Sequence, residues 1–291
     1  MTSAARPAPP NPEDARARLA ALGTGAAWLL GVAGCLELVS FFLGSSSLAE
    51  AVVGALLVDV AAGRAGIAWT LDEPARPLLM RRCLKAGAAA GAAALVTLLA
   101  ALVASWARVH PGHLDALLLL SALGAVAAAI RDELLLRGFV AHAVAKAGLG
   151  SGVAVAFSAL LSVAWILPKG PTPAAAALAL TSGALFAVVY ARLGGAWPAI
   201  AANASFSLLL GPFSRGGLVD LEWLTGELAV GASADGPPAL VAAGVAATTA
   251  LLLARLLRRK DTPEVERRDD DGDSDRGARE DPEPLEEADP R

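Results

Sequence analysis

The sequence predicts an all-α, polytopic transmembrane helical bundle of about eight spans, and three observations support this fold class. Of the 291 residues, 55% are hydrophobic and 18% are charged, whereas a soluble domain carries about 25% charged residues. The apolar residues form long blocks such as 25–43 and 86–106, and about 20 apolar residues cross a hydrocarbon core about 30 Å thick. Several consecutive blocks have no polar face to present to water, so a soluble Ala-rich bundle is the weaker alternative.

Eight candidate spans follow one another along the chain. The second is the weakest, because Glu50, Asp59 and Arg64 interrupt it. Charged residues within a span usually face the interior of a bundle or lie at its boundary. The predicted spans are 24–43, 48–70, 86–106, 114–130, 151–167, 173–191, 196–211 and 237–257.

The placement of Lys and Arg predicts the orientation, because these residues concentrate in cytoplasmic loops. Only Arg108, Lys169 and Arg215 fall on one side of the eight spans. We therefore expect a multi-pass protein of the cell membrane, such as a bacterial inner membrane, with both termini in the cytoplasm. The side predicted to be cytoplasmic collects Arg16, Arg18, Arg76, Arg81, Arg82, Lys85, Arg131, Arg137, Lys146, Arg192, Arg258, Arg259 and Lys260.

The segment after Lys260 has a different composition from the rest of the chain. From Asp261 onward there are 14 Asp and Glu and 5 Lys and Arg, and large apolar side chains are almost absent. Such a segment buries too little surface to offset the entropy of ordering, so it predicts a disordered acidic tail. The basic residues of the body form no contiguous soluble face, which argues against a nucleic-acid partner. Membrane lipid is the expected partner, with a membrane or peptide partner left open.

The most informative polar stretch is RDELLLRGF, residues 131–139. On a helix, Glu133 and Arg137 are four residues apart and face each other, so they can form an ion pair. Asp132 points about 100° away from Glu133 and is left free for another role. Taken alone, the stretch reads as a cytoplasmic helix end with a surface ion pair.

Four segments in order change that reading. Residues 132–138 are similar to a Glu-Glu-x-x-x-Arg-Gly motif, and 158–165 to an apolar helix carrying Phe-x-x-x-His. Residues 182–192 are similar to the Gly- and Tyr-containing helix that comes next, and 197–207 to a His-x-x-x-Asn motif. Together they resemble the CPBP family, the intramembrane CAAX proteases and bacteriocin-processing metalloproteases, over about 115–212.

The resemblance implies a role for each matched acid and base. In that family the first acid activates a water, the second lies beside it, and the arginine orients the pair. Carried onto this chain, the first acid is Asp132, the second is Glu133 and the arginine is Arg137. These three are the candidate catalytic residues.

The departures from the family pattern fall on the remaining positions. The two histidines that hold a water or a metal correspond to Trp165 and Asn203, and the asparagine that assists the oxyanion corresponds to Ser207. Catalytic zinc is held by His, Cys and carboxylate ligands, while Trp offers no lone pair and an Asn amide is a poor ligand. We therefore expect no metal and no cofactor, with zinc only in a working protease. The side chains of Asp132, Trp165, Asn203 and Ser207 should converge on one pocket in the cytoplasmic half, with the indole N–H aimed at Asp132 or a backbone carbonyl.

Other polar residues are weaker candidates. His110 and His113 form a His-Pro-Gly-His sequence that predicts a loop, and His142 lies about 140° around the helix from Arg137. An intramembrane carboxylate such as Glu37 is a functional candidate by default, and pairing with Arg64 is the structural alternative.

These features divide the chain into five segments and leave three functions open. The leading function is a catalytically impaired CPBP-type homologue that acts as a membrane binding or scaffolding protein. The first alternative is an active metallo-endopeptidase that processes prenylated or leader peptides, and the second is a small transporter component. The segments are a polar N-terminus (1–22), N-terminal transmembrane helices (23–113), a CPBP-like core (114–212), a loop and last transmembrane helix (213–257) and the acidic tail (258–291).

Overall fold

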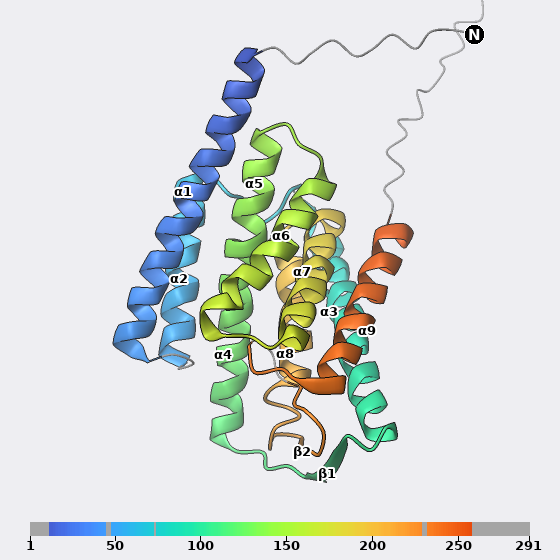
Figure 1. Cartoon of the computed structure of the whole chain (residues 1–291). Helices are drawn as coiled ribbons and strands as arrows, with labels where there is room; N and C mark the ends of the chain where they lie inside the picture. The colour runs from blue at the N-terminus through green and yellow to red at the C-terminus, as the bar shows by residue number, and fades with distance from the viewer. Residues whose placement is uncertain (1–11, 45–47, 73, 229–231, 258–291) are drawn as a thin grey trace, which may run out of the picture. The chain divides into compact units, whose positions relative to one another are not determined.

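The computed structural model describes residues 12–44, 48–72, 74–228 and 232–257, and helices dominate these ranges (Figure 1). The all-α fold class is therefore confirmed. The predicted disordered tail lies outside the described residues. The elements are α1 (Pro12–Leu43), α2 (Leu48–Ala65), α3 (Arg76–Val103), β1 (Ala107–Pro111), α4 (Ala116–Glu133), the π-helix η1 (Leu134–Gly138), α5 (Phe139–Lys146), α6 (Ser151–Ile166), the 3-10 turn η2 (Leu167–Lys169), α7 (Pro173–Leu193), α8 (Ala196–Leu210), β2 (Val219–Trp223) and α9 (Gly236–Leu256).

Five of the described helices are long and apolar enough to cross a membrane: α1, α3, α6 together with η2, α7 and α9. α8 is a shorter apolar helix. Their outer faces carry large exposed apolar side chains, such as Phe41, Leu99, Val103 and Leu251. Exposed apolar surface on this scale is not tolerated in water and is expected against hydrocarbon. The chain is therefore a membrane protein.

Small residues lie inside the bundle and large ones lie outside. The buried positions of α3 are mainly Ala and Gly, while Leu95 and Leu99 of the same helix are exposed. A methyl group added at Gly87 would lie 3.0 Å from the Ser205 hydroxyl of α8. Small side chains let membrane helices approach closely, and α3 packs along α8 in this way.

Local sequence signals set several helix ends. The Asp115 carboxylate accepts a hydrogen bond from the Leu118 amide at 2.9 Å and so begins α4. The Thr172 hydroxyl does the same for the Ala175 amide at 3.0 Å, directly before the Pro that opens α7. Such N-caps satisfy amides that have no partner within the helix. α7 ends at Gly194, whose φ of +90° suits glycine and reverses the chain into α8.

α4, η1 and α5 form one continuous helical path through the bundle (Figure 1). The sequence placed Arg131 and Arg137 after a span that ends at residue 130, among the charges on the cytoplasmic side. The position beyond the end of the span is wrong, because the exposed fractions of the two side chains are only 12% and 4%. The helix continues to Lys146, so both arginines lie within the bundle. The remaining Lys and Arg residues keep the asymmetry that predicted the orientation.

Other boundaries also differ from the predicted spans. α1 begins at Pro12 and α3 at Arg76, ten or more residues before the apolar blocks that predicted them. α2 ends at Ala65, and Thr70 instead forms a β-bridge with Gly195. In both helices the charged residues that precede the apolar block are also helical, and hydropathy alone does not show this.

A two-stranded antiparallel sheet joins the segments after α3 and α8. β1 and β2 pair from Ala107 opposite Trp223 to Pro111 opposite Val219. His110 therefore lies in a strand and not in a loop, and its ring contacts the Glu222 carboxylate at 3.1 Å. His113 follows the strand in irregular backbone.

The remaining polar candidates fall outside the core. Glu37 is exposed on α1 and forms no ion pair with Arg64 or with any other described residue. His142 lies on α5, where its Nε2 atom is buried without a hydrogen-bond partner among the described residues. The alternative of a Glu37–Arg64 ion pair is therefore wrong.

Candidate functional site

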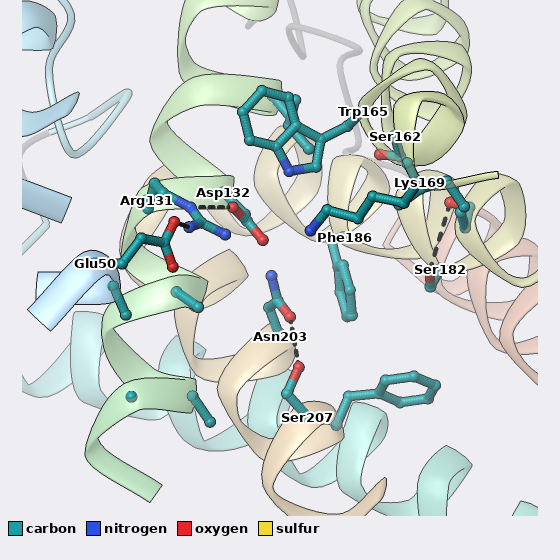
Figure 2. Close-up of a pocket in the computed structure, with 18 of the residues that line it drawn as sticks. Glu50, Arg131, Asp132, Ser162, Trp165, Lys169, Ser182, Phe186, Asn203 and Ser207 are labelled. Atoms are coloured by element: carbon teal, nitrogen blue, oxygen red, sulfur yellow. Dashed lines mark hydrogen bonds and ion pairs between the residues drawn. The ribbon is translucent and has the colours of Figure 1, made fainter. Parts of the chain in front are cut away.

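A cavity of about 680 Å³ opens between α2, α4, η1, α6, α7 and α8 (Figure 2). Asp132, Arg137, Trp165, Asn203 and Ser207 all lie in its wall, although they come from three separate parts of the chain. The segments chosen from the sequence therefore meet at one place. The polar and aromatic-polar residues of the wall are Ser40, Glu50, Ser121, Arg131, Asp132, Arg137, Ser162, Trp165, Lys169, Ser182, Asn203 and Ser207.

Glu133 lies behind this wall and forms a buried ion pair with the wall residue Arg137. The guanidinium lies 3.2 Å from the carboxylate, and the exposed fractions of the side chains are 0% for Glu133 and 4% for Arg137. The predicted pair is confirmed, and the alternative of a surface ion pair is wrong. Arg137 also donates to the Ser162 hydroxyl at 3.1 Å and lies 5.5 Å from the Phe186 ring centroid. The arginine therefore connects η1 to α6 and α7.

Asn203 completes the environment of Glu133 from α8. Its Nδ2 donates to the Glu133 carboxylate at 2.7 Å. Its Oδ1 accepts from the Ser207 hydroxyl at 3.0 Å (Figure 2). Both bonds require the same orientation of the amide, because a carboxylate only accepts and the hydroxyl here donates. The position at which the resemblance places a histidine therefore holds a hydrogen-bond donor directed at the carboxylate.

Arg131 connects the Asp132 carboxylate to α2. It donates to Asp132 on α4 and to Glu50 on α2, each at 2.8 Å. Its guanidinium also lies 6.0 Å from the ring centroid of Trp165 on α6, a cation–π distance. One carboxylate oxygen of Asp132 is thereby occupied, and the exposed fraction of that side chain is 25%.

Trp165 borders the cavity opposite Asp132 (Figure 2). The expected hydrogen bond from its indole N–H to Asp132 or to a backbone carbonyl is not formed with any described residue. The indole ring instead stacks near the Arg131 guanidinium. Lys169 extends from η2 into the same space, and its ammonium points toward Asp132 and Asn203.

The cavity lies near one end of α1. Its wall includes Ser40, close to the end of α1, and Leu48 at the start of α2. The N-terminal end of α1, at Pro12, is therefore at the other end of that helix. With the N-terminus in the cytoplasm, the cavity would lie toward the non-cytoplasmic side. The predicted orientation and the predicted cytoplasmic position of the site cannot both hold.

Sequence reasoning missed several residues of the site. Glu50 was read only as an interruption of a weak span, and Arg131 and Lys169 only as flanking charges. Each is a charged residue beside an apolar block, and that signal alone does not tell a cavity wall from a loop. Ser162 lay inside the second matched motif but carried no assigned role.

The donor set does not suit the zinc ion that the resemblance implies. The cavity wall contains no His or Cys, and no group of three or more His, Cys, Asp or Glu side chains lies together among the described residues. Zinc sites in proteins draw their ligands from these residue types. In addition, Arg131, Arg137 and Lys169 place positive charge around the cavity. No step of a reaction is therefore assigned to a metal here.

The fold and the cavity together define a class: a polytopic membrane bundle with a buried acid–arginine pair at the convergence of α4, α6, α7 and α8. Residues 114–209 match the family model described as "Type II CAAX prenyl endopeptidase Rce1-like". Over these residues the chain is similar to CAAX-protease-type membrane proteins of the CPBP family, which is the resemblance that the sequence motifs predicted. No curated protein and no solved structure matches the chain.

Proposed function

We propose that this CPBP-type protein has lost hydrolytic activity and acts in the membrane as a binding or scaffolding protein. The observation that carries the proposal is the Asn203 side chain, which donates to Glu133 at 2.7 Å. A histidine in that place could hold a water or a metal through a ring-nitrogen lone pair. The Asn203 amide nitrogen has none to offer.

The surroundings of the acids support the same proposal. A general base must lie within hydrogen-bond reach of the proton that it removes. Glu133 is enclosed by Arg137 and Asn203, and no part of it is exposed. Asp132 remains in the wall but is held by Arg131, and the position facing it is a Trp165 indole instead of an imidazole.

The cavity itself supports binding. Its volume of about 680 Å³ lies within the range of ligand pockets. We further propose that the protein is metal-free, that membrane lipid or a membrane-embedded partner is its ligand, and that both termini are cytoplasmic.

Metal analysis and cleavage assays test the loss of hydrolysis. We expect the purified protein to contain far less than one zinc per chain, and to leave prenylated and leader peptides intact in liposomes. Stoichiometric zinc that disappears in the Asp132→Asn variant, or cleavage that does so, would show a working protease with substitute ligands.

A reversion experiment tests the physical reason. Trp165→His with Asn203→His, on an Asp132→Glu background, should raise zinc content because two imidazoles then face a longer carboxylate. Trp28→His on α1, outside this cavity, is the matched control for an added imidazole and should leave zinc content unchanged. Zinc uptake equal in both proteins would mean that Trp165 and Asn203 do not replace metal ligands.

A further inference from the structure

Two charged groups face the cavity without being paired with each other. Asp132 uses one carboxylate oxygen on Arg131 and remains 25% exposed. Lys169 is exposed, lines the cavity and forms no ion pair within the part of the chain that the structure describes. Figure 2 shows the ammonium extending toward Asp132 and Asn203 across open space. The cavity thus presents an acceptor and a cation on opposite walls.

The charges around the cavity sum to zero. Glu50, Arg131 and Asp132 together carry one negative charge, and Lys169 carries one positive charge. The ion pair of Glu133 with the wall residue Arg137 is neutral as a unit. A ligand with a net charge would leave one of the facing groups uncompensated. Desolvated, uncompensated charge is costly, so a ligand that carries both signs fits best.

The remaining wall is apolar and reaches the outer surface of the bundle. Leu48, Leu120, Leu178 and Phe206 line the cavity away from the charges. Leu120 of α4 is at the same time 46% exposed, among the large apolar side chains that face hydrocarbon. An amphiphile from the surrounding bilayer can therefore place its head between the charges and its chains along this apolar side.

We propose that the cavity binds the head group of a zwitterionic phospholipid that carries a primary ammonium, of the phosphatidylethanolamine class. The lipid ammonium donates to the Asp132 carboxylate, and the lipid phosphate accepts from the Lys169 ammonium. The inference rests on the proposed function, because a cavity with no hydrolytic centre is free to retain a lipid.

The head-group chemistry separates this lipid from its neighbours in a membrane. A primary ammonium donates three hydrogen bonds, and a quaternary choline ammonium donates none. Phosphatidylglycerol has the phosphate but no cation, so it leaves Asp132 uncompensated. The site should therefore favour phosphatidylethanolamine over both phosphatidylcholine and phosphatidylglycerol.

Lipid retention tests the proposal directly. The full-length protein is reconstituted in vesicles of equal parts phosphatidylethanolamine, phosphatidylcholine and phosphatidylglycerol, extracted in mild detergent, and its retained lipid is quantified by native mass spectrometry. We expect one phosphatidylethanolamine per chain. Lys169→Gln should weaken its retention about tenfold, because a hydrogen bond between charged groups is worth about that factor. Lys146→Gln, which changes an exposed lysine of α5 outside the cavity, should retain the lipid like the parent.

A second part of the experiment tests the role of Asp132. Asp132→Asn should remove the preference for phosphatidylethanolamine over phosphatidylcholine, while the exposed Asp220→Asn on β2 should keep it. Preference for phosphatidylglycerol, or equal retention in the parent and the Lys169→Gln variant, would overturn the proposal. Equal retention would mean that Lys169 and Asp132 neutralise each other.

The experiments distinguish a failure of the proposed loss of hydrolysis from a failure of the proposed lipid ligand. Zinc with peptide cleavage refutes the loss of hydrolysis whatever lipid is retained. A metal-free, inert protein without lipid selectivity refutes only the ligand.

Discussion

Replacing Arg137 by alanine should destabilise the protein strongly, because the substitution leaves a buried carboxylate without its cation. Glu133 is fully buried and lies 3.2 Å from the guanidinium, and its second carboxylate oxygen has no described partner. After the change, Asn203 is the one described residue that still donates a hydrogen bond to that carboxylate. Breaking a buried ion pair costs about 3–5 kcal/mol, and the contacts of Arg137 with Ser162 and Phe186 are lost as well.

Accumulation in membranes and the apparent melting temperature in detergent measure this cost. Arg108→Ala is the matched control, because Arg108 is exposed on β1 and should change stability by about 0.5 kcal/mol or less. Adding Glu133→Gln to the Arg137→Ala variant should recover part of the loss, since the neutral amide needs no cation. Normal accumulation and melting of Arg137→Ala would refute the argument, and the buried pair would then not hold the bundle together.

Two further predictions concern packing and topology. Gly183→Ala should destabilise the α6–α7 contact by about 1–3 kcal/mol, because the new methyl group would lie 2.5 Å from the Ser162 hydroxyl. Gly152 has open space around it, so Gly152→Ala is the control and should leave the melting temperature unchanged. Reporter fusions after Pro168 and after Lys260 should lie on opposite sides of the membrane; finding both on one side would refute the predicted number of spans. The fusion after Pro168 also reports which side the cavity faces, because this position adjoins a cavity-lining lysine.

The helices were predictable because each apolar block must satisfy its own backbone in hydrocarbon. For that reason all eight predicted spans overlap described helices. The sheet of β1 and β2 was not predictable, because the pairing of Ala107 with Trp223 joins segments more than 100 residues apart. No local pattern records a pairing at that separation.

The sequence predicted which residues lie in the candidate site, but it did not predict most of the contacts between them. Spacing alone paired Glu133 with Arg137, since a helix brings residues four apart together. The partner of Arg131 is Glu50, from a different helix, and no periodicity connects the two. Hydropathy also ended the fourth span at residue 130, because it scores a charged residue as solvated whether or not a buried partner compensates it.

The acid–arginine motif has a structural role in this bundle that does not depend on catalysis. Helices whose interior is mostly alanine bury little surface against one another, and lipid supplies no hydrophobic force between them. Hydrogen bonds and ion pairs between helices therefore contribute more to the specificity of packing. Glu133 on α4 contacts Arg137 on η1 and Asn203 on α8, and Arg137 continues to Ser162 on α6. Loss of any one member leaves a buried group unpaired, so packing alone constrains these residues, and the motif by itself is no evidence of hydrolysis.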